Sequence, residues 1–163
     1  MPDALGPAFK YAPQGIAIFN AAVFLDSLRY KFTDHPKTQE IFGRLDAWSA
    51  GLGLPGLFGH TGVFSQHVIG GAELVASILL LTGAFYPPLR HLLPLGALLG
   101  LVVMSGAIAF HLFTPLGVDP NKDGGGLFVA ACAIWILSVA LLVMKASELD
   151  LLARRAGAAF APV

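Results

Sequence analysis

A few charged or titratable side chains lie within or beside the apolar runs of this 163-residue chain. Charged groups are costly at membrane depth, so they usually face other helices, pair with one another and mark functional sites. Carboxylates, imidazoles and amines so placed can bind polar ligands or transfer protons. Six side chains are therefore candidates for ligand binding or proton handling: Asp26, Arg29, Lys31, His67, Glu73 and His111.

Glu73 is near the middle of an apolar run, and helical spacing places Gln66, Gly70 and Ser77 on the same stripe of that helix. A carboxyl group buried there is either protonated or paired with a cation. One interpretation is an interhelical hydrogen bond that fixes packing. The other is a group that handles protons or binds a ligand.

The remaining candidates also have two interpretations each. Asp26 and Arg29 are three residues apart, which favours a local ion pair on one helix. The alternative is that Arg29 pairs with Glu73 or binds an anionic or carbonyl-bearing ligand. His67 and His111 lie near helix ends, where an interface hydrogen bond is favoured over metal or haem ligation. Histidines on two helices can hold a haem axially, but no CxxCH motif is present, and we predict no metal site.

The composition indicates which elements position these residues. Hydrophobic residues make up 56% of the chain and charged residues only 12%, against about 25% charged residues in soluble domains. A transmembrane helix needs about 20 mostly apolar residues. We predict an all-α integral membrane four-helix bundle, a single transmembrane domain over residues 1–163. The predicted spans are 15–32, 63–83, 89–113 and 127–145, and residues 33–62 form an outer cap with a short amphipathic helix.

The first predicted span is the weakest, because four polar or charged residues interrupt it, and a helix on the membrane surface is the alternative. Lys and Arg residues near the span ends favour both termini in the cytoplasm, in a bacterial inner membrane. This orientation places Asp26, Arg29, His67 and His111 in the outer half of the bundle, with Glu73 just beneath, so we predict a polar pocket there, roofed by the cap. The formal net charge is zero and no basic tract is present, so we expect no nucleic-acid partner.

Three segments resemble the DoxX-like family of small four-helix membrane proteins. The first span ends in FLDSLRYKF, the second reads GVFSQHVIGGAELVASILLLTGAF, and the third leads into FHLFTPLGVDPNKDGGGLF. The resemblance covers most of residues 15–145, whereas the long 33–62 segment departs from the shortest family members. It implies a membrane protein associated with redox or stress-defence partners, and it draws attention to Lys31, Glu73 and His111 without making any of them catalytic.

Three functions follow as hypotheses, and the sequence does not decide whether the protein is an enzyme. The first is a membrane subunit of a redox complex that contacts a quinone, since an apolar bundle with a few convergent polar groups suits such a ligand. Haem is the less favoured cofactor. The second is an accessory subunit whose polar groups only specify packing. The third is a small transporter. Besides the lipid bilayer, we expect other membrane subunits or a second copy of the chain as partners.

Overall fold

The computed structural model describes residues 6–159, and these are helical apart from turns and loops. The elements are α1 (Gly6–Lys31), α2 (Pro36–Gly51), α3 (Gln66–Phe85), the short 3-10 helix η1 (Pro87–Leu89), α4 (Leu92–Phe113), α5 (Gly126–Met144) and α6 (Ala146–Ala159). The expected all-α class is confirmed.

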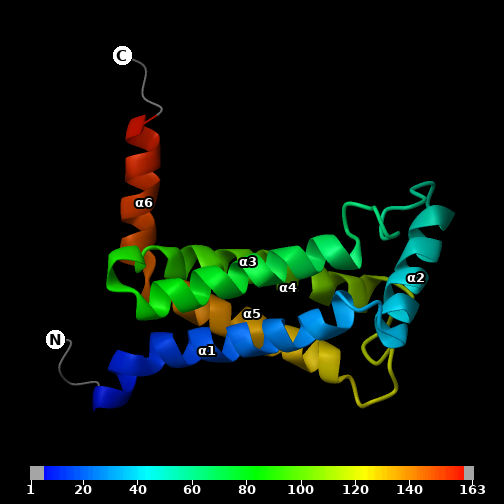
Figure 1. Ribbon diagram of the computed structural model, residues 1–163, viewed down its shortest axis with the longest axis horizontal. Coiled ribbons are helices and arrows are strands. Elements are labelled where there is room, and N and C mark those ends of the chain that lie inside the picture. Colours follow the sequence, from blue (N-terminus) through cyan, green and yellow to red (C-terminus); the bar gives the residue numbers. More distant parts are fainter. Residues whose placement is uncertain (1–5, 160–163) are drawn as a thin grey trace.

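Four helices, α1, α3, α4 and α5, lie side by side along the long axis of the molecule (Figure 1). Helix α2 lies across one end of this bundle, and α6 leaves the opposite end. The first turns of α1 and the last turns of α5 are both at the end from which α6 departs. The predicted cap over 33–62 therefore corresponds to α2 and the loop that follows it.

Three of these helices, α3, α4 and α5, are long and apolar enough to cross a membrane. Helix α1 is not among them, so the structure supports three of the four predicted spans. The polar residues Asn20, Asp26, Arg29 and Lys31 account for the difference. The boundary of α1 also differs from the prediction, since the helix begins at Gly6 and continues through Pro13.

Local signals determine where the apolar helices begin and end. The Ser65 side chain accepts a hydrogen bond from the Val68 amide at 3.3 Å and caps the start of α3. Pro87 follows Tyr86, the C-terminal cap of α3, and disfavours helical backbone at the residue before it, so α3 ends at Phe85. The Asp123 carboxylate accepts a hydrogen bond from the Gly126 amide at 3.2 Å where α5 begins.

Small residues allow the central helices to approach closely. A Cβ added at Gly83 would lie 2.2 Å from the Leu93 backbone nitrogen, and one at Gly96 would lie 2.8 Å from the Leu80 nitrogen. A Cβ at Gly100 would meet the Phe24 ring at 3.3 Å. Gly96 and Gly100, four residues apart on α4, therefore form a small-xxx-small pair that admits the neighbouring helices. The core that these contacts enclose consists of Ala17, Phe24, Ala76, Leu80, Leu93, Ala97, Met104, Ala131, Ile134 and Leu141.

A second, smaller core attaches the cap to the bundle. Leu45 on α2, Phe58 in the following loop and Leu116 in the α4–α5 loop are buried together. Ile41 and Trp48 pack against them, as expected for the amphipathic helix predicted here.

The outer faces of the bundle carry exposed apolar side chains on every long helix. The larger ones include Ile18, Phe19, Leu25, Leu74, Val75, Ile78, Leu98, Val102, Val129, Ile136 and Val143. Apolar surface on this scale marks contact with lipid or with other proteins. Together with the three apolar helices, it identifies a membrane protein.

Candidate functional site

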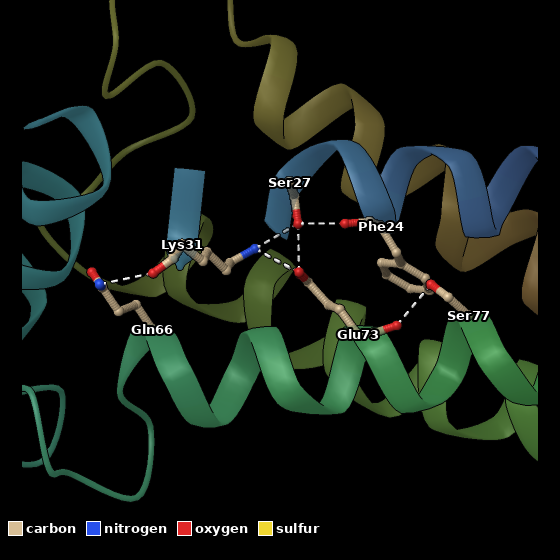
Figure 2. Close-up of polar contacts among 6 residues, drawn as sticks. All are labelled: Phe24, Ser27, Lys31, Gln66, Glu73 and Ser77. Carbon is tan, nitrogen blue, oxygen red and sulfur yellow. Dashed lines mark hydrogen bonds and ion pairs between the residues drawn. The ribbon is translucent and has the colours of Figure 1, made fainter. Parts of the chain in front are cut away.

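Among the ion pairs of the described residues, the most buried joins Lys31, at the end of α1, to Glu73, in the middle of α3. The Lys31 ammonium nitrogen lies 2.8 Å from each carboxylate oxygen of Glu73. The Ser27 hydroxyl, one helical turn before Lys31, donates to Glu73 Oε2 at 2.5 Å and accepts from Lys31 at 3.0 Å. Figure 2 shows these three side chains meeting between the two helices. Glu73 is therefore paired with a cation, one of the two states predicted for it.

Burial makes this pair important for stability. The Glu73 side chain is only 4% exposed and that of Lys31 16%. Removing one member of a buried ion pair leaves the other charge uncompensated, which costs about 3–5 kcal/mol. The pair joins the end of α1 to the middle of α3, and losing either charge alone is expected to destabilise the fold.

The stripe on α3 that faces α1 was predicted correctly from its spacing. Gln66, Gly70, Glu73 and Ser77 are all buried, and the exposed Ile78 lies on the other side. A Cβ at Gly70 would meet the Phe32 ring at 3.2 Å, whereas one at Gly71 would meet nothing within 4 Å. Of these two adjacent glycines, only Gly70 admits the neighbouring helix.

Asp26 and Arg29 form the local pair that their spacing favours. Their charged atoms are 3.0 Å apart, and the side chains are 60% and 65% exposed. The Arg29 guanidinium also lies over the Tyr30 ring, 4.8 Å from its centre. Arg29 does not pair with Glu73; Lys31 does, and its spacing from Ser27 on one face of α1 was the available signal.

His111 joins the end of α4 to the following loop. Its Nδ1 atom lies 2.6 Å from the carbonyl oxygen of Gly117, and its ring packs edge-on against Phe128 with 5.6 Å between centres. The residue is 7% exposed. The favoured interface hydrogen bond is thus present.

Further along this loop, Asp119 organises the turn before α5. Its carboxylate accepts hydrogen bonds from the backbone amides of Asp123 at 2.9 Å and Gly124 at 3.2 Å. The amide of Asp123 contributes most to holding the pKa of Asp119 below its ordinary value of 3.8.

His67 belongs to a different group of side chains at the cap end of the bundle. It lies in the first turn of α3 beside Asp34, from the α1–α2 turn, and His60, from the α2–α3 loop. One candidate ligand atom from each of the three lies within 4.8 Å of those of the other two. Asp34 and His60 were not among the predicted candidates, because 26 residues separate them in the sequence and no short motif joins them.

A cavity of about 120 Å³ opens next to this group, between α2 and the loop that follows it. Its lining residues are Gln39, Phe42, Gly43, Asp46, Phe58, Gly59, His60 and Gln66. The six predicted residues thus take part in separate contacts: an exposed pair on α1, a buried pair between α1 and α3, a histidine at the cap and a histidine at the α4–α5 loop. Ligand binding or proton transfer by any of them stays a prediction.

Comparison with known proteins identifies no relative of this chain. No family model, no curated protein and no solved structure matches it.

Proposed function

We propose that this chain is an accessory subunit of a redox-linked membrane complex, and that its bundle holds the cap at one membrane surface. The observation that supports the accessory role is that the buried Glu73 carboxylate is already paired within the bundle. Both oxygens of Glu73 bind Lys31, and Ser27 occupies the remaining approach. A group that exchanges protons or binds a ligand needs access, whereas a fully paired group specifies packing. The link to redox chemistry rests on the resemblance to DoxX-like proteins.

We further propose that α1 is a fourth span. Its exposed face carries Ile18, Phe19 and Leu25, and the exposed charges Asp26 and Arg29 neutralise each other close to the cap. With four crossings, both chain ends lie on one side, which we assign to the cytoplasm of a bacterial cell. A green fluorescent protein fused after residue 163 should then fluoresce, while a periplasmic reporter at the same position should be inactive. The reverse pattern would overturn this orientation.

Purification from membranes of the source organism, with the surrounding lipids retained, tests the accessory role. We expect a partner protein in fixed stoichiometry by native mass spectrometry, and absorbance from a redox cofactor in that complex. Recovery of the chain alone, without partner or cofactor, would contradict the proposal.

A double variant separates packing from chemistry at the buried pair. K31M/E73M replaces the two charges by apolar groups of similar size, which is often neutral for stability. We expect the partner and its activity to be retained. A folded double variant that keeps the partner but loses the activity of the complex would instead make Glu73 a functional group.

A second candidate function is binding of a quinone ring in the cap cavity. The Phe42 and Phe58 side chains offer aromatic surface, and His60 offers a ring nitrogen that can hydrogen-bond a quinone carbonyl. Quinone extracted from the purified protein should approach one equivalent and fall at least about tenfold in F42A, a change that removes ring surface. Equal quinone content in F42A and the unmodified chain would exclude this cavity.

A further inference from the structure

We propose that Asp34, His60 and His67 bind a divalent transition-metal ion, with zinc as the best-matched ion. This site is independent of the proposed accessory role and departs from the prediction of no metal. Two imidazoles and one carboxylate form a ligand set that suits zinc and its neighbours in the first transition row. The three side chains come from three different segments, and the fold brings them together at the rim of the cap.

The distances are close to those that a metal ion requires. His67 Nε2 lies 3.9 Å from Asp34 Oδ1, and the ring centres of His60 and His67 are 4.6 Å apart. Ligand bonds of about 2.0–2.2 Å in tetrahedral geometry place ligand atoms roughly 3.3–3.6 Å from one another. Closing the present spacing, which is at most 4.8 Å, requires an adjustment of about 1 Å. His60 is exposed and lies in the α2–α3 loop, so its side chain can make most of this adjustment.

The His67 ring is placed to bind an ion through Nε2. The ring stacks on Phe32 with 6.2 Å between centres, which holds the imidazole in place. Its Nε2 atom faces Asp34, and neutral imidazole nitrogens are the commonest metal ligands in proteins. The other ring nitrogen, Nδ1, is buried without a hydrogen-bond partner among the described residues, and an ion on Nε2 would leave it so.

Two amide side chains orient the Asp34 carboxylate. Gln39 and Gln66 both donate to Asp34 Oδ1, and they bind each other at 2.8 Å. Gln66 is itself anchored by a hydrogen bond of 2.9 Å to the Lys31 carbonyl oxygen. Both amides use the same oxygen, so Oδ2 is available to an ion. Outer partners of this kind are a regular part of metal sites.

One electrostatic contribution, the helix dipole of α3, opposes the binding of a cation at this site. His67 lies in the first turn of α3, where the helix dipole disfavours a cation by about 0.3–1 kcal/mol. The Asp34 carboxylate places a full negative charge against this partial positive charge. Three protein ligands leave a fourth position open to water, as in zinc sites that are not purely structural.

Metal titration of the full chain in lipid nanodiscs tests the site. After treatment with a chelator, zinc is added in competition with a chromogenic chelator, and cobalt is used as a spectroscopic probe. We expect one equivalent of zinc and a cobalt absorption band of tetrahedral type. H60A and D34N alter exposed side chains and should fold normally, and each should weaken zinc binding by more than the about 10–100-fold that loss of an outer partner costs.

H91A is the matched control, because His91 follows η1 at the opposite end of α3. It should bind zinc as tightly as the unmodified chain. H67Q, with its fold checked by circular dichroism, should lose binding while F42A retains it, which separates this site from a quinone in the cavity. Absence of stoichiometric zinc, or equal affinity in H60A, D34N and H91A, would overturn the proposal, whatever the outcome for a partner subunit.

Discussion

The bundle and the cap place polar side chains in opposite ways. In the bundle, Lys31, Ser27 and Glu73 bind one another and exclude other partners. At the cap, Asp34 and His60 are exposed, and His67 has a nitrogen without a partner. A polar group left unsatisfied between helices in an apolar surrounding is costly, and the Lys31–Glu73 pair avoids that cost, although Asn20 Oδ1 elsewhere in the bundle is buried without a partner among the described residues. The exposed groups at the rim of the cap are accessible to a ligand. The comparison indicates that the buried charges stabilise the fold and that the open cluster is the place for binding.

The largest expected effect comes from breaking the buried pair. E73Q should destabilise the protein by about 3–5 kcal/mol, because it leaves the Lys31 ammonium without a counter-charge. Reversible unfolding in mixed micelles measures the change, and a double-mutant cycle with K31M gives the coupling energy. If E73Q unfolds like the unmodified chain, the pair contributes nothing to stability and the assignment of a structural role to it fails.

The next largest effect tests whether the cap and the bundle unfold independently of each other. L45A should destabilise the cap by about 2–5 kcal/mol, since Leu45 is buried in its small core. Hydrogen exchange should increase in α2 and in the α2–α3 loop, and should not change in the middle of α4. Equal loss of protection in α4 would mean that cap and bundle unfold as one unit.

Close helix packing allows a matched comparison within α3. G83A should cost about 1–3 kcal/mol, because the new Cβ collides with the Leu93 backbone. G71A, which meets no atom within 4 Å, should stabilise the helix by about 0.5–1 kcal/mol. Thermal unfolding of both variants checks the signs. A destabilised G71A would point to a neighbour that covers this face in the membrane.

The smallest effect is a pH dependence at the cap end. The folded state lowers the pKa of Asp119 below 3.8, chiefly through the Asp123 amide, so its charged form stabilises the loop. This contribution is present above pH 3.8 and is lost as pH falls through the lower pKa of the folded state. The amide resonances of Asp123 and Gly124 should therefore be constant from neutral pH down to about pH 4, and should shift below it. D119N should remove the shift.

Much of the fold could be predicted because apolar runs and their breaks are local. The runs that became α3, α4 and α5 were placed within three residues of their observed ends, since prolines, glycines and capping residues act on adjacent backbone. The stripe through Glu73 followed from helical spacing alone. The start of α1 was missed by nine residues, because Pro13 lies inside the helix, where proline normally breaks or kinks the chain and so predicts a boundary.

The candidate residues were recovered less completely than the helices. Composition and spacing were sufficient to identify Glu73 and His67 as polar groups among apolar neighbours, and to pair Asp26 with Arg29. Composition and spacing did not show whether Arg29 or Lys31 is the partner of Glu73, since the two cations lie only two residues apart on the same helix.

The sequence by itself determined that this is an all-helical membrane protein, where its apolar helices lie and which face of α3 is polar, because these properties depend on residues a few positions apart. Only the tertiary structure decided which cation meets Glu73, and only it joined Asp34, His60 and His67. Those contacts depend on the rotation of α1 against α3 and on the conformation of the α2–α3 loop. Both are determined by packing between segments that are distant in the sequence.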